Sequence, residues 1–139
     1  MARRKFRIPN SPQPINLALQ NTHVQKRFSN FSCHINRGCA TWRGSLQPRS
    51  VSAIYQIEIR YKQKQIPKVK VISPTLASDS PHLYSDRSLC LYWPKEWCWQ
   101  QNNLIADIII PWTASWLYYY ELWLDTGKWL GPSSHDNPK

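Results

Sequence analysis

The stretch VSAIYQIEIRYK, residues 51–62, constrains the fold more than any other part of the sequence. Apolar residues alternate with polar ones along it. The residues that would lie on the apolar face are Val51, Ala53, Tyr55, Ile57, Ile59 and Tyr61. Ile54 alone departs from the pattern. Alternation with a period of two is typical of a strand with one buried and one solvated face, as in an antiparallel sheet. We therefore expect a strand over residues 51–62, in a sheet that is covered on one side.

The segments on either side of this stretch predict its neighbours in the sheet. ATWRGSLQ, residues 40–47, is a plausible partner strand, and KVKVIS, residues 68–73, is another that Pro74 stops. Three or four strands in a meander are therefore expected, with four as the preferred number.

Helices are predicted at both ends of this sheet. From Ile15 onward, apolar residues share one helical face, with Asn16 as a candidate N-cap; they are Leu17, Val24, Phe28 and Phe31. Near the C-terminus the spacing i, i+1, i+4, i+7, i+8 is occupied by Trp116, Leu117, Tyr120, Trp123 and Leu124. Thr113, after Pro111, is the expected cap of this second helix, and Gly127 its expected end. A helix, a meander and a helix predict an α+β fold.

Residues 75–101 lack periodicity, which is unusual for a segment this long in a compact domain. Loops of this length are usually functional. Cys90 lies within it, eight residues after His82.

Length and charge limit the organisation and the partners. A chain of 139 residues is enough for one domain with one core. We expect a basic flexible tail at residues 1–14, a folded domain at 15–130 and a C-terminal tail at 131–139. The net charge of +10 favours an acidic partner, either nucleic acid or an acidic protein surface. The basic start MARRKFR is more typical of a solvated arm than of a nucleic-acid hook.

The longest apolar stretch, residues 104–124, does not predict a membrane span. It contains Asp107, Pro111 and Glu121, and a carboxylate at the bilayer centre costs about 2.5–3.5 kcal/mol. No apolar segment follows the basic start, so no signal peptide is expected. These features predict buried structure in a cytoplasmic protein whose thiols stay reduced.

The cysteines do not show the spacing of a metal site. Five residues separate Cys33 from Cys39, and seven separate Cys90 from Cys98, whereas zinc ligands usually lie two to four residues apart in turn knuckles. The four histidines do not complete such a pattern. No metal and no other cofactor are expected, and Cys33, Cys39 and Cys98 are interpreted as small buried residues.

The surroundings of Cys90 carry a resemblance that changes its interpretation. Residues 81–91, PHLYSDRSLCL, and the later Trp97 resemble the active-site segment of ubiquitin-conjugating enzymes, in which His-Pro-Asn-Ile-Tyr precedes a polar turn and Ile-Cys-Leu. The order of elements over residues 15–126 also matches. The resemblance implies a ubiquitin-conjugating-like fold in which Cys90 accepts an acyl group as a thioester. Tyr84 and Trp97 would support the loop.

A narrower resemblance involves the same loop and the C-terminal helix. HLYSDRSLCLYWPKEWCW and IIIPWTASWLYYYELWLDTGKWLG are similar to the small conjugating-enzyme-like proteins of bacterial CBASS anti-phage operons. In that family the domain forms a thioester with the C-terminal glycine of a cGAS-like nucleotidyltransferase and passes it to an amine. The resemblance implies that cyclase as the partner, bound through its C-terminal tail. The chain has no glycine-rich adenylation loop, so it resembles the stand-alone form, and any activating enzyme would be a separate protein.

Two positions depart from the pattern of ubiquitin-conjugating enzymes. His82 replaces the catalytic asparagine and Ser80 replaces the histidine before the proline. A histidine donates one hydrogen bond when neutral and two when charged, so His82 can stabilise an oxyanion or act as a base. Alternatively, it only stabilises the loop. Asp86 either orients the amine or polarises the turn, or it is a solvated turn residue.

Other interpretations remain open beside the transferase. One is a catalytically silent binding module of the same fold, although such variants usually lack the cysteine. Another is a basic aromatic nucleic-acid binder, which needs aromatic and basic residues on one sheet face. Arg60 and Lys62 would lie on the other face of their strand from its aromatic residues, so a nucleic-acid partner is not favoured. The aromatic residues after Cys90 either exclude water from a thioester or belong to the core; they are Tyr92, Trp93, Trp97 and Trp99.

Overall fold

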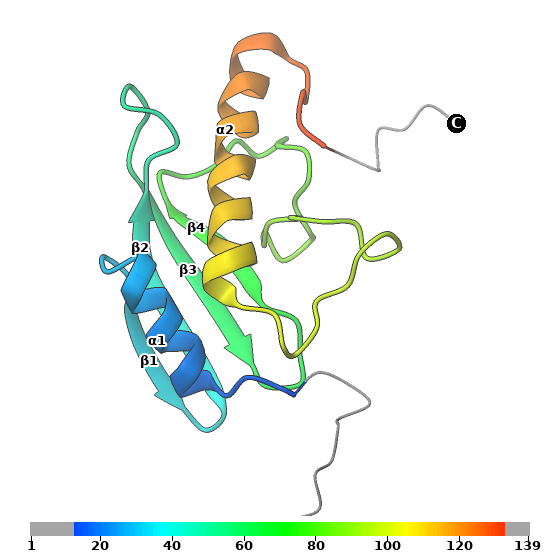
Figure 1. The fold of residues 1–139 in the computed structure, drawn as a ribbon. Coiled ribbons are helices and arrows are strands. Elements are labelled where there is room, and N and C mark those ends of the chain that lie inside the picture. Colours follow the sequence, from blue (N-terminus) through cyan, green and yellow to red (C-terminus); the bar gives the residue numbers. More distant parts are fainter. Residues whose placement is uncertain (1–12, 133–139) are drawn as a thin grey trace, which may run out of the picture.

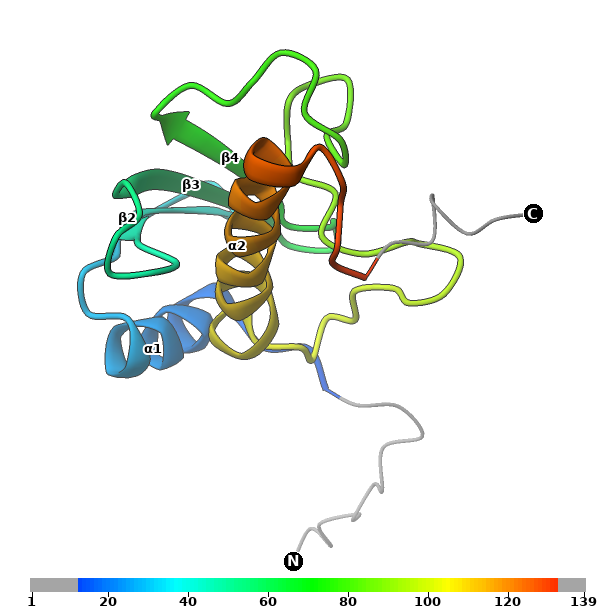
Figure 2. The same cartoon turned by 90° about the horizontal axis from the view of Figure 1, so that it is seen from above.

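The computed structural model describes residues 13–132, in which two helices lie on the same face of one antiparallel sheet (Figures 1 and 2). The elements are α1 (Leu17–Arg27), β1 (Ser32–Asn36), β2 (Cys39–Leu46), β3 (Tyr55–Lys62), β4 (Lys68–Ser73), a π-helical turn η1 (Ile105–Ile109) and α2 (Ile110–Thr126). The sheet order is β1-β2-β3-β4. The predicted α+β class with four strands is confirmed. The expected tails lie almost entirely outside the described residues, and the domain boundaries stay predictions.

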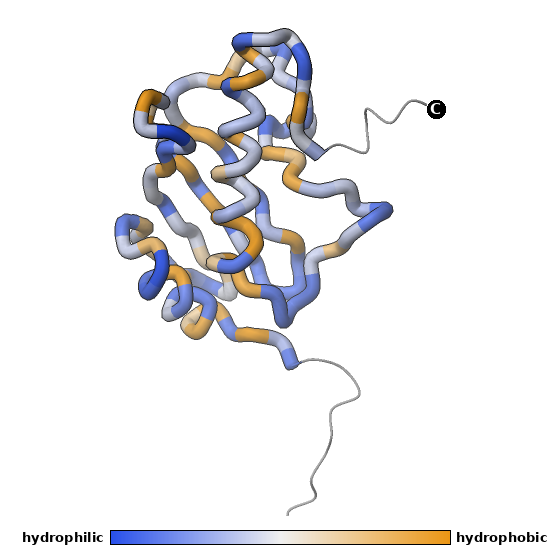
Figure 3. The backbone as a smooth tube through the Cα atoms, turned by 45° about the horizontal axis from the view of Figure 1, so that its top comes forward, coloured by the Kyte–Doolittle hydropathy of each residue, from blue (hydrophilic) through white to orange (hydrophobic). Residues whose placement is uncertain are grey.

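The alternation that predicted the long strand also explains how the sheet is buried. In β3, Tyr55, Ile57, Ile59 and Tyr61 face the helices and are buried, whereas the residues between them are partly or fully exposed. Hydrophobic and hydrophilic residues accordingly follow one another along the strands (Figure 3). The predicted start at Val51 is wrong, because Val51 is 83% exposed and β3 begins at Tyr55. The alternation runs on into a loop that has no partner strand.

The first strand, β1, was not recognisable from the sequence. Most of its residues are exposed, as expected for a strand at the edge of the sheet, so it shows no alternation. It pairs with β2 through a two-residue turn in which Arg37 and Gly38 have φ values of 50° and 74°. Two successive positive φ values are the geometry of a tight hairpin turn.

The first helix begins as predicted and ends earlier. The Asn16 side chain accepts a hydrogen bond from the Leu19 amide at 2.8 Å, which confirms the N-cap. The helix ends at Arg27, so Phe28 is its C-cap, and Phe31 lies in the segment leading to β1. Phe31 is nevertheless buried, because the chain turns back over the sheet. The helical face predicted through Phe31 was therefore too long.

The second helix starts before its predicted cap. Thr113 lies inside α2, where its hydroxyl donates to the Ile109 carbonyl at 2.7 Å, so its prediction as N-cap is wrong. Pro111 occupies the first turn, where its missing N–H costs little. Gly127 ends the helix with φ 75° and donates to the Trp123 carbonyl at 2.8 Å, as predicted. Among residues 13–132, no helix combines the length and apolarity that crossing a membrane requires.

A buried carboxylate connects α2 to the loop before β3. Glu121 is 9% exposed and accepts hydrogen bonds from the Ser52 hydroxyl at 2.6 Å, the Tyr55 hydroxyl at 2.9 Å and the Arg49 guanidinium at 3.1 Å. Burial alone would raise the pKa of Glu121, but these hydrogen bonds outweigh it and the pKa is lowered. The carboxylate is therefore ionised and holds the loop against the helix.

We expect Glu121→Gln to lower the free energy of unfolding by about 1.5–3 kcal/mol, because hydrogen bonds to a charged acceptor are lost. The lowered folded-state pKa means that Glu121 stabilises the protein above its unfolded pKa of about 4.3, and that this stability is lost as pH falls through the folded pKa. Urea unfolding between pH 7 and pH 3 should show a gap between wild type and variant that narrows in acid. Asp125→Asn, an exposed position on the same helix, is the control. A constant gap would contradict the assignment.

Candidate active site

The long loop that contains Cys90 is attached to the edge of the sheet. The Leu89 amide donates to the Val69 carbonyl of β4 at 2.8 Å. Lys68, at the start of β4, donates to the Asp86 carboxylate at 2.9 Å. These two contacts place the loop beside β4 even though residues 75–101 form no helix or regular strand, in agreement with the missing periodicity.

Within this loop, residues 82–90 form a small hairpin. Leu83 and Leu89 pair as an isolated antiparallel bridge, and the Cys90 amide donates to the His82 carbonyl at 2.9 Å. Arg87 has φ 70° in the turn. The hairpin therefore places His82 directly across from Cys90.

Asp86 fixes the turn of this hairpin. Its carboxylate accepts hydrogen bonds from the Ser88 hydroxyl at 2.5 Å and the Ser88 amide at 2.9 Å. These bonds, followed by the bond from Lys68, lower the pKa of Asp86. The carboxylate is thus ionised, and its contacts are with the turn and with β4.

Cys90 is half-buried, and its thiol donates to the Tyr92 carbonyl at 3.4 Å. Tyr84 lies close to the sulfur: burial raises the pKa of the Tyr84 phenol, and a side-chain hydrogen bond with Cys90 raises it further. The phenol therefore stays neutral beside the sulfur. A neutral phenol can donate a hydrogen bond to that atom.

His82 has an unusual backbone as well as a position opposite Cys90. Its φ is 58°, in the left-handed region where histidine, asparagine and aspartate are enriched among non-glycine residues. Its ring packs on Trp129, with ring centroids 4.6 Å apart. The residue type therefore suits both the backbone and the ring contact.

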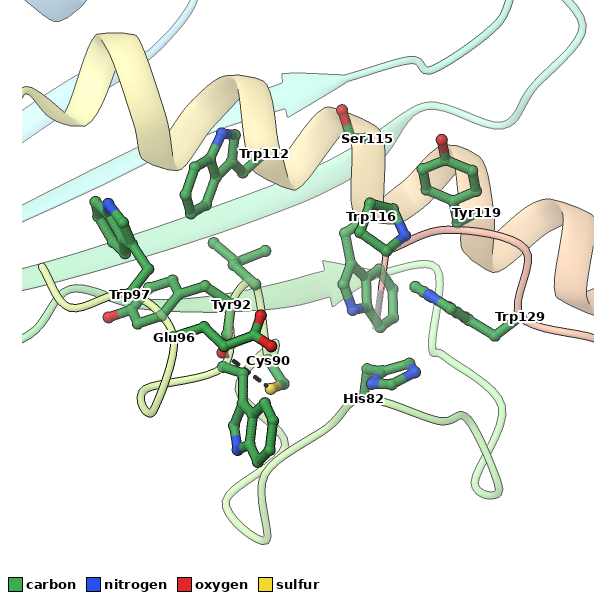
Figure 4. Close-up of a pocket in the computed structure, with 13 residues that line it drawn as sticks. His82, Cys90, Tyr92, Glu96, Trp97, Trp112, Ser115, Trp116, Tyr119 and Trp129 are labelled. Atoms are coloured by element: carbon green, nitrogen blue, oxygen red, sulfur yellow. Dashed lines mark hydrogen bonds between the residues drawn. The ribbon is translucent and has the colours of Figure 1, made fainter. Parts of the chain in front are cut away.

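An aromatic pocket of about 630 Å³ opens beside Cys90 (Figure 4). Its walls come from the hairpin and the chain after it, from one face of α2, and from the segment that follows α2. The residues that line it are His82, Cys90, Leu91, Tyr92, Trp93, Glu96, Trp97, Trp112, Ser115, Trp116, Tyr119, Trp129 and Pro132. Trp97 packs against both Tyr92 and Trp112, at centroid distances of 4.8 and 4.9 Å.

The structure brings some of the predicted site residues together and separates others. His82, Cys90 and Trp97 share the aromatic pocket, whereas Asp86 lines a smaller concavity together with Lys68. Tyr84 lines that smaller concavity too, but its side chain also contacts Cys90. Tyr92 and Trp93 line the pocket as well. Trp99 lies in the core, 6% exposed, and its indole donates to the Tyr61 hydroxyl at 3.2 Å.

Sequence reasoning missed the wall that the C-terminal part contributes. Trp112, Trp116 and Tyr119 follow one another at i, i+4 and i+7, which puts them on one helical face. This spacing was a usable signal. Trp129 had none, because it lies beyond the end of α2 and lines the pocket only because the chain after this helix turns back (Figure 1).

The remaining cysteines are all free thiols with different surroundings. Cys33 and Cys39 are half-buried, and burial raises the pKa of Cys33. Cys98 is exposed, so its interpretation as a buried residue is wrong; its thiol donates to the Pro94 carbonyl at 3.2 Å. Within residues 13–132, no three His, Cys, Asp or Glu side chains gather as metal ligands would. A structural role for Cys33 and Cys39 stays a prediction.

Comparison with known proteins gives the family. A search of curated proteins finds no match. The family model described as "Type II CBASS E2 protein" matches residues 20–136, which include the whole sheet, the Cys90 hairpin and α2. A match over more than half of the chain shows membership: this protein belongs to the Type II CBASS E2 family and is an E2-like conjugating transferase of the bacterial CBASS anti-phage systems.

Proposed function

We propose that Cys90 forms a thioester with the C-terminus of a cGAS-like nucleotidyltransferase and transfers that acyl group to an amine. The observation that carries the proposal is the half-buried Cys90 thiol at an aromatic pocket, on a hairpin attached to β4. The domain acts as a stand-alone, ubiquitin-conjugating-like protein. The acyl group comes from a separate activating enzyme.

The chemistry needs one thiol and no hydrolytic triad. The Cys90 sulfur gives up its proton, attacks the carbonyl carbon of the activated tail and displaces the activating enzyme's thiolate. An amine then attacks the same carbon, the carbon–sulfur bond breaks, and Cys90 leaves as a thiolate while the amine loses a proton. Cysteine suits both steps because it is intrinsically very nucleophilic and forms covalent intermediates readily.

The surrounding residues have separate tasks in this proposal. His82, across the hairpin from Cys90, stabilises the oxyanion formed when the amine attacks. Tyr84 donates to the sulfur and Trp97 supports the aromatic wall, which keeps water from the thioester. Asp86 acts at a distance, by fixing the turn through Ser88 and Lys68.

The partner is proposed from the family and from charge. Members of the Type II CBASS E2 family associate with CBASS components, and the cyclase is the component with a C-terminal tail to activate. The net charge of +10 favours an acidic surface on that partner. The reaction requires reduced thiols, which the cytoplasm maintains.

Co-expression with the neighbouring cyclase and activating enzyme tests the proposal. We expect intact mass spectrometry to show this chain carrying the mass of one cyclase less one water, and the adduct to disappear after treatment with a thiol. A cyclase without its C-terminal tail is the control and should form no adduct. Binding of the complete cyclase with no adduct under any of these conditions would favour the silent binding module instead.

A further inference from the structure

Two buried indole N–H groups in the pocket wall have no hydrogen-bond partner within residues 13–132: Nε1 of Trp116 and Nε1 of Trp129. Trp116 is 4% exposed, and both rings line the pocket that contains Cys90. Their ring centroids lie 5.4 Å apart, and Trp129 also packs on His82 (Figure 4). Buried polar groups nearly always have a hydrogen-bond partner. Two such donors in one pocket wall therefore indicate a ligand that supplies acceptors.

The two buried tryptophans away from the pocket, Trp42 and Trp99, do have partners for their indole N–H groups. Trp42, which is fully buried, donates to the Asn21 side chain at 3.0 Å. Trp99 donates to the Tyr61 hydroxyl at 3.2 Å. The fold thus provides acceptors for the buried indoles that lie away from the pocket. The two indole N–H groups without a partner, those of Trp116 and Trp129, both belong to the pocket wall.

The pocket also indicates the chemistry of its ligand. An indole can only donate, so the ligand must present acceptors. Among the described lining residues, Glu96 is the only Asp, Glu, Lys or Arg, and its carboxylate disfavours an anion. Carbonyl oxygens of an uncharged group fit both conditions. Flat peptide groups can also stack against the aromatic walls, and about 630 Å³ is within the usual range for ligand pockets of about 300–1,000 Å³.

We propose that Trp116 and Trp129 donate hydrogen bonds to backbone carbonyl oxygens of the acyl-donor tail and thereby hold its last residues in the aromatic pocket beside Cys90. This inference rests on the proposed function, because the tail is the acyl group that Cys90 would carry. The two indoles are binding residues of the transferase and add a selectivity for an extended peptide with uncharged residues at its end.

The test uses a chemical donor, so neither a cyclase nor an activating enzyme is needed. The probe is the thioester of acetyl-diglycine with mercaptoethanesulfonate. The Cys90 sulfur attacks its carbonyl, mercaptoethanesulfonate leaves as a thiolate, and the thiol proton passes to the buffer. A Cys98→Ser background removes the exposed competing thiol. Peptide mapping identifies the acylated residue, and ¹H–¹⁵N spectra report the indole N–H groups.

On acylation we expect the indole proton signals of Trp116 and Trp129 to move downfield, as hydrogen bonds to carbonyl oxygens form. Trp129→Phe should slow loading at low probe concentration by about 2–10-fold, the effect of losing one neutral hydrogen bond. Trp99→Phe also removes a buried indole, but its N–H bonds to Tyr61 away from the pocket. It is the matched control and should load normally. Trp129→Phe keeps the test independent of whether a variant at the more deeply buried Trp116 folds.

The outcomes separate this inference from the proposed function. Acylation of Cys90 without movement of the two indole signals, or with equal loading of Trp129→Phe and wild type, overturns the inference alone. Failure of Cys90 to accept the probe overturns both. Signals that already lie downfield, and that move upfield when the chain is cut after Pro132, would assign the acceptors to residues 133–139 and also overturn the inference.

Discussion

Cys90→Ala is expected to abolish the covalent intermediate with the cyclase completely, while the fold and partner binding remain. The thiol is half-buried and donates to the Tyr92 carbonyl, and the change to alanine removes a single sulfur atom. The measurement is intact mass after co-expression, combined with a pull-down of the cyclase. Cys98→Ser, an exposed cysteine in the same loop, is the control and should retain the adduct.

Replacing the same residue with serine gives a second, opposite signature. Cys90→Ser should accumulate an ester that forms slowly and resists thiol treatment, because an alkoxide is a poorer leaving group than a thiolate. Normal conjugate formation by Cys90→Ala would refute the conjugating role assigned to this residue.

His82→Ala is expected to slow discharge of a preloaded thioester into free amine by about 10²–10³-fold, the usual effect of removing one oxyanion donor. Loading of Cys90 should persist, because the proposed role of His82 belongs to the later step, in which it stabilises the oxyanion formed when the amine attacks. The assay is a single turnover, in which the loss of thioester is followed by mass after addition of a free amine.

The backbone at His82 requires its own controls. Its φ of 58° is strained for alanine, by about 1–2 kcal/mol, so His82→Ala changes both the ring and the hairpin. Glycine tolerates this φ but has no side chain, and His82→Gly should therefore be as slow as His82→Ala. Asparagine tolerates the conformation and can donate a hydrogen bond, so His82→Asn should recover much of the rate. Discharge by the glycine variant at the wild-type rate would leave His82 with a role in the loop alone.

Much of the sheet and both helices could be predicted because their signals are local. Each signal depends on residues that are close together in the sequence: the alternation in β3, the N-cap at Asn16 and the C-cap at Gly127. The errors lie where local pattern and tertiary partner disagree. The alternation of apolar and polar residues extends to Val51, where no neighbouring strand pairs with the chain. Phe31 fits the spacing of the helical face, but it is buried in the segment between α1 and β1 and not in the helix.

The candidate site divides in the same way. The hairpin that pairs Cys90 with His82 spans nine residues, and the resemblance of this continuous segment to conjugating enzymes indicated both side chains. The pocket around them depends on distant segments. Trp112 and Trp116 enter from α2, and Trp129 enters from the chain beyond it.

The sequence by itself therefore determined the α+β order, because period-two alternation, helical spacing and caps act over a few residues. Cys90 and His82 were indicated by the resemblance of residues 81–91 to the active-site segment of conjugating enzymes. The tertiary structure alone decided that Asp86 contacts the turn and β4, and that Trp116 and Trp129 share a wall with Cys90. Those relations arise when α2 packs across the sheet and the following segment folds back, since burial of aromatic surface acts between any residues that the fold brings together, regardless of their separation in the chain.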